Sequence, residues 1–332
     1  MSKKIRFGII GCGAIAQWHI TAIVAMEHAE LAAVMDTNSA AAQHWSEEYD
    51  VPFYTDVESL LQSDIDAVSI CTPSGLHAEL AIKALRAGKH VVVEKPMAIT
   101  SDSLDALLQA ERESTAMLCP ISQLRSMPDV QKAKKLIEDG VLGKIVLADL
   151  SMKYYRTPKY YEEKKWRGTW AMDGGGALMN QGIHGLDLMR YLCGEVKSVS
   201  TCAGALFHSI ETEDTLAASL TFSHGGFGVL TATTSVFPGF RRRLEICGTD
   251  GSLVLEETQL TQLQTRSGMT LDGVVKEQKS GSSDPSQIDF EPHIMQYRDI
   301  TQAILFGTDL KLTSEDAANT VRLVLDLYEA AR

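Results

Sequence analysis

A lysine directly after an apolar run is the first residue of this chain whose type and position suggest catalysis. Val91, Val92 and Val93 precede Glu94, Lys95 and Pro96. Ligands of open α/β sheets bind outside the carboxyl ends of the strands, so Lys95 is expected beside a ligand. Next to a positively charged ligand its pKa would fall, and the amine could then take a proton from a hydroxyl group. The alternative is an exposed lysine at the end of a strand that Pro96 terminates.

A second group of polar residues follows the three glycines 174–176. Asn180 and His184 are four residues apart, and Asp187 lies three further on. A helix here would place the three side chains on one face, while the apolar residues after Asp187 pack in the core. The imidazole could accept or relay a substrate proton, and the Asn180 amide could orient a neighbouring hydroxyl group. The alternative is a histidine that only packs against the helix or caps it.

A glycine-rich turn near the N-terminus has the spacing of a dinucleotide-binding loop. Gly11, Gly13 and Ala16 fit the pattern GxGxxA, between an apolar run and a helical pattern. Gly11 permits a tight turn, Gly13 lets a pyrophosphate approach the backbone, and Ala16 allows close packing of helix on strand. The start of the helix adds free N–H groups and a positive dipole. We therefore assign six consecutive residues to cofactor binding: Gly11, Cys12, Gly13, Ala14, Ile15 and Ala16.

An acidic residue ends the second apolar run, where the ribose of a dinucleotide would lie. Asp36 follows the glycine turn by about 20 residues, and a carboxylate at this place accepts hydrogen bonds from ribose hydroxyls. It would repel a 2′-phosphate, and residues 37–43, beginning with Thr37, contain no Lys or Arg to bind one. The expected cofactor is therefore NAD, with NADP disfavoured. The alternative is a glycine turn and a solvated aspartate without a ligand.

Short apolar runs alternate with helical patterns over the first 120 residues. The strand-like runs are Arg6–Ile10, Leu31–Met35, Ala67–Cys71, His90–Val93 and Ala116–Cys119, and the helical patterns cover 14–26, 76–87 and 104–114. Continuous apolar strands separated by amphipathic helices are typical of a parallel sheet covered on both faces. We therefore expect an α/β fold that begins with a doubly wound Rossmann domain at residues 1–122.

Longer strand patterns follow residue 120. They are Ile145–Tyr155, Val196–Leu206, Thr215–Phe222, Gly228–Val236, Arg243–Cys247 and Ser252–Glu256, with helical patterns at 130–138, 293–306 and 314–331 and a loop at Gly281–Ser286. Glycine pairs and the sequence Thr249-Asp250-Gly251 are typical turns between antiparallel strands. We expect an α+β domain with a large, mostly antiparallel open sheet at residues 123–332, whose terminal helices can pack on the first domain. The apolar face of such a sheet needs a cover, which predicts a homodimer or homotetramer.

Composition narrows the function classes. With 31 Lys and Arg against 43 Asp and Glu, the net charge is −12, which disfavours nucleic acids and anionic membranes as partners. The sequence contains no run of about 18 apolar residues, so a membrane span is not expected. The N-terminus lacks the pattern of a signal peptide. The six cysteines never show CxxC spacing. They are expected to be free thiols in the cytoplasm, with no metal site.

In combination, the motifs resemble the Gfo/Idh/MocA oxidoreductases. The resemblance lies in Gly11-x-Gly13-x-x-Ala16, Asp36, Thr72-Pro73 with His77, Glu94-Lys95-Pro96, Gly182-x-His184-x-x-Asp187, Glu213-Asp214-Thr215, Gly248-Thr249-x-Gly251 and His293. It implies hydride transfer between a nicotinamide and a hydroxyl or keto carbon of a sugar, polyol or nucleotide sugar. It also implies that Lys95 and His184 carry the acid and base roles. The cofactor would be lined by Thr72, Pro73, His77, Glu94 and Gln123.

One departure from the family pattern concerns Asn180. Many members have aspartate there, and a neutral amide neither acts as a base nor raises the proton affinity of His184. More of the proton transfer then rests on Lys95. The sequence Asn-Gln-Gly-Ile-His at 180–184, with Trp166-Arg167-Gly168 upstream, resembles the branch that contains UDP-N-acetylglucosaminuronate 3-dehydrogenases.

Further polar and aromatic residues are candidates for substrate contacts. These are Arg125, Tyr155, Trp166, Arg167 and His293, with Tyr154, Tyr160, Tyr161 and Trp170 nearby in sequence. Packing in the core or an interface is the alternative for each of them. The run Arg241–Arg243 is more typical of a solvated strand start than of a phosphate site. The scaffold also allows two other functions: NAD-dependent cleavage of a glycoside, or NAD(H) sensing without catalysis.

Overall fold

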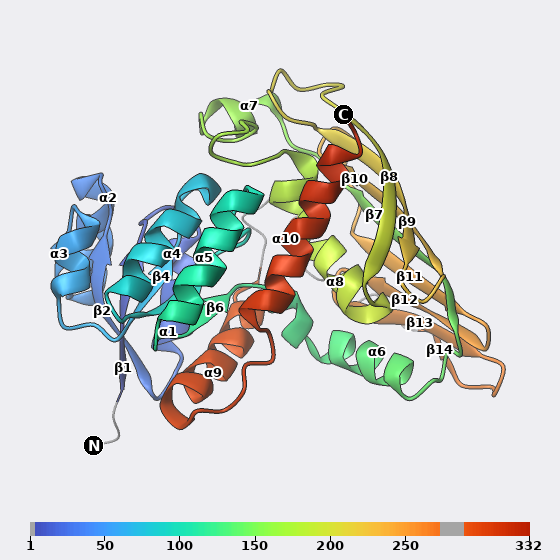
Figure 1. Ribbon diagram of the computed structural model, residues 1–332, viewed down its shortest axis with the longest axis horizontal. Coiled ribbons are helices and arrows are strands. Elements are labelled where there is room, and N and C mark those ends of the chain that lie inside the picture. Colours follow the sequence, from blue (N-terminus) through green and yellow to red (C-terminus); the bar gives the residue numbers. More distant parts are fainter. Residues whose placement is uncertain (1–3, 273–288) are drawn as a thin grey trace. The chain divides into compact units, whose positions relative to one another are not determined.

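The computed structural model describes residues 4–272 and 289–332, in two units. The first unit comprises Met1–Gln123 and Phe290–Asn319, and the second comprises Leu124–Asp289 and Thr320–Arg332. The sequence colours of Figure 1 show that the first unit is built from both ends of the chain. The loop expected at Gly281–Ser286 lies outside the described residues.

The first unit contains a six-stranded parallel sheet with the order β3-β2-β1-β4-β5-β6. Its strands are β1 (Ile5–Ile10), β2 (Ala29–Met35), β3 (Phe53–Tyr54), β4 (Ala67–Ile70), β5 (His90–Val93) and β6 (Leu118–Pro120). Its helices are α1 (Ala16–Val24), α2 (Ser39–Tyr49), α3 (Val57–Gln62), α4 (His77–Arg86), α5 (Ser101–Glu113), α9 (Glu291–Phe306) and the first part of α10 (Ser314–Glu329). The predicted Rossmann domain is confirmed.

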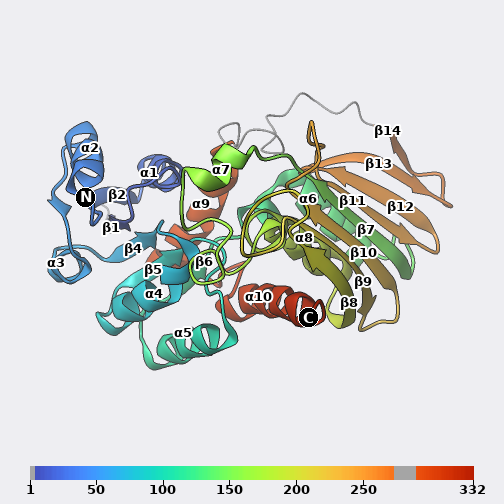
Figure 2. The ribbon, with the colours of Figure 1, turned by 90° about the horizontal axis from the view of Figure 1, so that it is seen from above.

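Helices cover both faces of this sheet. Helices α1 and α9 pack together on one face and α4 and α5 on the other, as Figure 2 shows. Ile20 of α1 and Tyr297 and Ile300 of α9 join Phe7 and Ile9 of β1 in one buried core. The sequence patterns did not predict α2, in which only Ala42 and Trp45 are buried, nor the two-residue strand β3.

The register of the parallel strands brings their carboxyl ends to one edge. Ile10 pairs with Met35 on one side and Ile70 on the other, and Ile70 pairs with Val93. The residues that follow these four strands therefore emerge side by side. The strand order also reverses at β1 and β4, the place where doubly wound sheets bind ligands.

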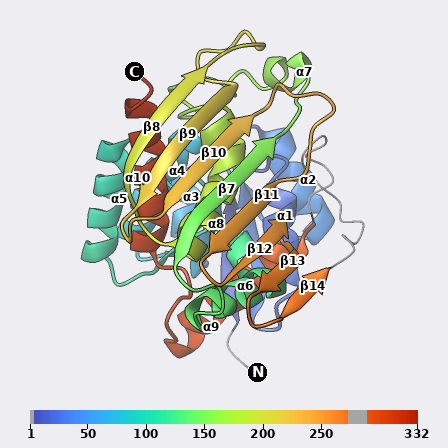
Figure 3. The ribbon, with the colours of Figure 1, turned by 90° about the vertical axis from the view of Figure 1, so that its right-hand side faces the viewer.

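The second unit contains an eight-stranded sheet with the order β14-β13-β12-β11-β7-β10-β9-β8, seen face on in Figure 3. Its strands are β7 (Ile145–Lys153), β8 (Val196–Gly204), β9 (Thr215–Phe222), β10 (Phe227–Thr233), β11 (Arg243–Gly248), β12 (Gly251–Glu256), β13 (Gln259–Thr265) and β14 (Thr270–Asp272). All pairs are antiparallel except β10 with β7. The prediction of a mostly antiparallel sheet is confirmed. It omitted the edge strand β14 and its neighbour β13, whose residues are largely polar.

The helical elements of this unit are α6 (Pro128–Glu138), α7 (Pro158–Glu162), the π-helical segment Ala177–Gly182, α8 (Ile183–Cys193) and the last part of α10. Three of them, α6, α8 and the π-helical segment, pack on one face of the sheet. Helix α8 packs on β7 and β11, and α6 packs on β13. Leu150 and Leu230 on that face are buried, whereas Leu147, Phe227 and Val229 on the opposite face are exposed. Among the described residues of this unit, no helix covers this opposite face, as Figure 3 shows.

Two sequence expectations concern the whole chain. Across the part of the chain that the structure describes, every helix is too short or too polar to cross a membrane. All six cysteines are free, as predicted, and four of them are buried: Cys12, Cys71, Cys119 and Cys193.

Candidate active site

The glycine turn after β1 has the geometry that a pyrophosphate requires. Gly11 has a φ of +95°, and a Cβ there would lie 2.9 Å from the carbonyl carbon and oxygen of Cys71. Gly13 is exposed, and a Cβ built on it would meet no atom within 4 Å. Gly11 is thus required by the fold, while Gly13 leaves open space beside the backbone.

The first turn of α1 pairs some of its own donors, since the N–H of Ala16 donates to Gly13 O at 3.1 Å and that of Trp18 to Ile15 O at 3.0 Å. No side chain caps it at Ile15, and it carries no acidic residue. A helix start without an acidic residue or a side-chain cap favours an anion through the positive end of its dipole. A phosphate group would interact favourably with this dipole.

Asp36 links the end of β2 to the glycine turn. Its Oδ2 accepts a hydrogen bond of 2.8 Å from the backbone N–H of Cys12, and its Oδ1 accepts one of 2.8 Å from Asn38. Each oxygen keeps a lone pair for a ribose hydroxyl. Burial, with a contribution from Asp36, raises the pKa of the Cys12 thiol to about 12. Cys12 is therefore a neutral thiol at pH 7 and not a nucleophile.

Buried polar groups around β4 and β6 also fit a dinucleotide. Thr72 Oγ1 and Gln123 Oε1 are buried and have no hydrogen-bond partner among the described residues. Such groups usually mark a place where a ligand or water completes the bonding. His77 is itself buried and lies between two backbone oxygens, with Nδ1 2.7 Å from Pro96 O and Nε2 2.8 Å from Thr72 O. It ties the end of β4 to the turn after β5, and burial lowers its pKa.

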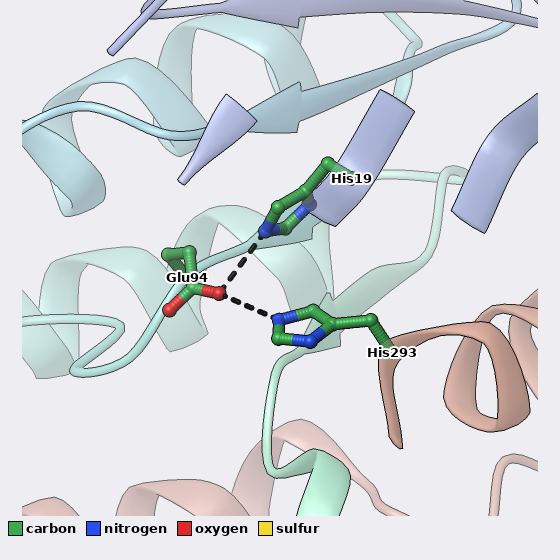
Figure 4. A group of neighbouring side chains, drawn as sticks. All are labelled: His19, Glu94 and His293. Carbon is green, nitrogen blue, oxygen red and sulfur yellow. Dashed lines mark hydrogen bonds and ion pairs between the residues drawn. The ribbon is translucent and has the colours of Figure 1, made fainter. Parts of the chain in front are cut away.

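A buried carboxylate holds the corner that carries Lys95. Glu94 Oε1 lies 3.0 Å from His19 Nε2 and 3.2 Å from His293 Nε2, and Oε2 accepts a bond of 3.0 Å from the N–H of Lys95. Figure 4 shows the two imidazoles converging on this one oxygen from α1 and α9. The Glu94, His19 and His293 side chains are buried, while Lys95 is half-buried.

The hydrogen bonds decide the charge of this group. Burial alone would raise the pKa of Glu94, but the bonds from His19 and His293 hold that pKa well below its ordinary value. Burial lowers the pKa of His19, whose Nδ1 lies 2.6 Å from Ser69 Oγ and 2.8 Å from the Tyr297 hydroxyl. The three ligand-type atoms lie within 4.8 Å of one another, as in metal sites. Hydrogen bonding alone accounts for this spacing.

His19, Ser69 and Tyr297 also belong to this network, although no sequence motif indicated them. One signal was present: His19 lies on the side of α1 that faces the core, three residues after Ala16. His293, predicted to contact substrate, is 1% exposed and its Nε2 faces Glu94.

A second buried carboxylate holds the segment before His184. Glu213 Oε1 accepts from the Leu178 N–H at 2.8 Å and from the Tyr328 hydroxyl at 2.9 Å, and Oε2 accepts from the Gly176 N–H at 3.0 Å. A Cβ on Gly176 would lie 1.7 Å from the backbone oxygen of Glu213, so only glycine fits. Burial raises the pKa of Glu213 to about 7.

Asn180 and His184 do not lie on one regular α-helix, the geometry that the expected shared face assumed. Residues 177–182 form a π-helix, and α8 begins only at Ile183, with half-buried His184 in its first turn. The bonds from the start of this segment to Glu213 fix its first turn in this wider form. π-Helical turns are frequent at functional sites because they redirect side chains.

Asn180 has a carboxylate partner that the sequence analysis did not identify. Its Nδ2 donates to Asp173 Oδ1 at 2.7 Å, and its Oδ1 accepts from Gln181 Nε2 at 3.1 Å. Asp173 Oδ2 accepts from the Gly168 N–H at 2.9 Å. The amide therefore has a fixed orientation.

Asp187 serves a different purpose from Asn180. It accepts two hydrogen bonds from Arg125, of 2.7 and 2.6 Å, and both side chains are buried. Thr320 adds a bond of 2.8 Å to Asp187. Arg125, predicted as a substrate contact, therefore ties α8 to the segment before α6.

The remaining substrate candidates lie around α7. Arg167 lies over the Tyr160 ring, with 3.8 Å from the guanidinium carbon to the ring centre. Tyr155 lies edge-on to the exposed Phe237 at 5.3 Å, and Trp166 is half-buried. Substrate binding by Tyr155, Trp166 and Arg167 stays a prediction.

Comparisons with known proteins identify the family of the chain. Residues 5–121 match the family described as "Oxidoreductase family, NAD-binding Rossmann fold", and residues 130–254 match the "GFO/IDH/MocA C-terminal domain". The chain is 27% identical to an inositol 2-dehydrogenase of Rhizobium meliloti, over 80% of this chain and 79% of that one. It is 28% identical to the scyllo-inositol 2-dehydrogenase (NADP(+)) IolW of Bacillus subtilis, over 81% and 77% of the two chains.

A solved structure is similar over nearly the full length. The WlbA dehydrogenase from Bordetella pertussis, in complex with NADH and UDP-GlcNAcA, superposes with a TM-score of 0.89 and is 30% identical. The similarity covers 99% of this chain and 97% of the other.

Proposed function

Because the chain belongs to the Gfo/Idh/MocA family of oxidoreductases, we propose that its reaction is hydride transfer between NAD and a hydroxyl or keto carbon of a sugar, polyol or nucleotide sugar. One observation carries the proposal. The glycine turn, Asp36, Thr72 and Lys95 all follow strands whose carboxyl ends are level at one edge of the Rossmann sheet. A dinucleotide lying along that edge would have its ribose at Asp36 and its reactive ring near Lys95.

The chain's own residues would handle the proton of the substrate hydroxyl. Bound NAD supplies the hydride acceptor. Lys95 takes the hydroxyl proton during oxidation and returns it during reduction. The Glu94 carboxylate holds the Lys95 backbone N–H at 3.0 Å, so that the base starts from a fixed point. His184 acts as the partner acid or base, and Asn180, oriented by Asp173, positions a substrate hydroxyl.

We also propose a preference for NAD over NADP. Asp36 would repel a 2′-phosphate, and residues 37–43 offer no cation to bind one. Because the relative from Bacillus subtilis has NADP(+) in its name, the preference for NAD over NADP needs a direct measurement. Both cofactors are therefore compared in the assay below.

The open sheet of the second unit is proposed as the surface of a homodimer or homotetramer. Leu147 and Phe227 are paired neighbours on β7 and β10, and Val229 follows on the same face. All three are exposed, at 41%, 61% and 40%. An apolar row of this kind on an uncovered sheet favours self-association.

The test is turnover with a panel of inositols, aldoses and sugar acids. Purified protein with NAD should generate the absorbance of the reduced cofactor with at least one of them, and less efficiently with NADP. Lys95→Met should lower kcat by ~10³-fold, since general acid–base catalysis contributes about 10²- to 10⁴-fold. It should keep its affinity for NADH. The control is Lys135→Met, which removes an exposed lysine of α6 and should change nothing.

Other outcomes would identify another function. Release of an aglycone from a glycoside without net reduction of NAD would indicate glycoside cleavage through a transient oxidation. Tight NADH binding with no turnover, equal in wild type and Lys95→Met, would indicate a cofactor sensor and overturn the proposal.

A further inference from the structure

One segment of the second unit is strongly basic in an acidic protein. Residues 153–167 contain six Lys or Arg and two Glu, whereas the whole chain has a net charge of −12. The segment includes α7 and ends at Arg167. Lys164 and Lys165, just before it, are exposed. A local excess of positive charge attracts anions regardless of the net charge of the protein.

Arg167 is bound only by neutral groups. Its Nη1 donates to the backbone oxygen of Tyr160 at 2.9 Å, and its guanidinium stacks on the Tyr160 ring. Its Nε is buried and has no hydrogen-bond partner in the described chain. The nearby carboxylate of Asp173 accepts instead from the Gly168 N–H and the Asn180 amide. Within the described residues, Arg167 therefore carries a charge that no carboxylate neutralises.

Three other arginines of this unit show the usual arrangement. Arg125, Arg190 and Arg242 are each buried, and each bonds to a carboxylate, that of Asp187, Glu195 and Glu257 respectively. A buried or half-buried guanidinium normally has such a partner because desolvation of its charge is costly. Arg167, half-buried and stacked, departs from this rule. The stacked ring holds the guanidinium plane while its N–H edge remains able to bind an oxyanion.

Hydrogen bonds connect this arginine to the segment that carries Asn180. The Tyr160 hydroxyl accepts from Gln181 Nε2 at 3.0 Å, and the same amide nitrogen donates to Asn180 Oδ1 at 3.1 Å. Arg156, also over the Tyr160 ring, donates to Gln181 Oε1 at 3.0 Å. Arg167 is thus connected through the Tyr160 ring and the Gln181 amide to Asn180, which is proposed to position the substrate.

We propose that Arg167 binds a negatively charged oxygen group of the substrate, so that the enzyme acts on acidic sugars in preference to their neutral counterparts. The inference rests on the proposed function, because it assigns a ligand class to the same site. Arginine suits this role because its planar N–H groups pair with the two oxygens of a carboxylate or with a phosphate. Both sources offer the same oxyanion chemistry, and the experiment separates them.

The experiment compares binding of sugars that differ only in the acidic group. Calorimetric titration of the NADH complex, which cannot oxidise an alcohol, uses methyl β-D-glucuronide against methyl β-D-glucoside, and glucose 6-phosphate against glucose. Wild type should bind at least one acid ~10-fold more tightly than its neutral counterpart, since a charge-assisted hydrogen bond is worth about that factor or more. A preference for the glucuronide assigns a carboxylate, and one for the sugar phosphate assigns a phosphate.

The variants distinguish Arg167 from general surface charge. Arg167→Gln should reduce the preference to less than ~2-fold, and Arg167→Lys should keep part of it, because lysine retains the charge but not the planar pairing. The control is Arg266→Gln, which removes an 80% exposed arginine and should leave the preference unchanged. Thermal melts establish that each variant is folded, and the lysine variant serves if the glutamine variant does not fold.

Two results would overturn the inference. One is wild-type protein that binds the acids no better than the neutral sugars, or binds none of the four. The other is a preference for acids that persists in Arg167→Gln. Lys95→Met separates this from the proposed function, because it should lower kcat by ~10³-fold while it leaves the preference for acids intact.

Discussion

The two units each contain one deeply buried glutamate that fixes the segment of a proposed catalytic residue, yet the two carboxyl groups differ in charge. Glu94 faces two imidazoles, and the hydrogen bonds from them hold its pKa well below the ordinary value despite burial. Glu213 faces two backbone N–H groups and a tyrosine hydroxyl, and burial raises its pKa to about 7. Neutral dipoles therefore compensate the loss of water less completely than imidazoles do.

The difference has a mechanical consequence. The Glu94 carboxyl group is ionised throughout the neutral range and keeps one geometry for the Lys95 corner. Glu213 changes its protonation near neutral pH, and with it changes the bonds that hold Gly176 and Leu178 at the start of the π-helix. The support of Lys95 is thus insensitive to pH, while that of the segment before His184 depends on it.

The largest expected loss of stability comes from a substitution of Gly176, because the backbone of Glu213 leaves no space there for a side chain. Gly176→Ala should lower the free energy of unfolding by about 4 kcal/mol or more, because its Cβ would lie 1.7 Å from the Glu213 backbone oxygen. The matched control is Gly13→Ala in the first unit, whose Cβ meets no atom within 4 Å. Urea unfolding should show a change within about 0.5 kcal/mol for that variant, while its affinity for NADH falls. Equal losses of stability would contradict the geometry.

Next in size is the removal of the buried charge at Glu94. Glu94→Gln should lower the free energy of unfolding at pH 7 by about 3 kcal/mol, because a buried, paired charge is lost and an amide N–H₂ would face the Lys95 N–H. Since the folded pKa lies below the ordinary value of 4.5, this stabilisation is present above pH 4.5 and is lost as the pH falls through the folded pKa. Urea unfolding of Glu138→Gln, which alters an exposed glutamate, is the control. An unchanged stability would show that the network is not ionised.

The smallest effect is a pH dependence at Glu213. A carboxyl group whose pKa rises from 4.5 to about 7 on folding binds its proton more tightly in the folded state. Its contribution is therefore full below pH 4.5 and lost as the pH rises through 7. Between pH 5 and pH 8 wild type should lose about 2 to 3 kcal/mol of stability from this group, and Glu213→Gln should lack that loss. A parallel pH profile for the two proteins would contradict the assignment.

How much of the site could be anticipated depends on whether its residues are neighbours in sequence. The glycine turn, Asp36 and Lys95 each follow a strand whose apolar run is visible in the sequence, and the level ends of those strands bring them to one edge. The Rossmann fold and the antiparallel sheet were predicted for the same reason, since strand and helix periods are local. The weakest periods, in α2, β3, β13 and β14, were missed because α2 buries only two side chains, β3 has only two residues, and β13 and β14 consist largely of polar residues.

The sequence by itself determined the cofactor loop, the order of strands and helices, and the residue types available for proton transfer, because each depends on spacing within a few residues. Only the tertiary structure decided which groups support them. His19 and His293 meet on Glu94 across 274 positions of chain, and Tyr328 reaches Glu213 over 115 positions. The π-helix at Asn180, the pairing of Arg125 with Asp187 and the unneutralised charge of Arg167 likewise follow from burial and long-range contacts. The physical reason is that a pKa and a hydrogen-bond partner are set by the atoms nearest in space, which a local pattern does not specify.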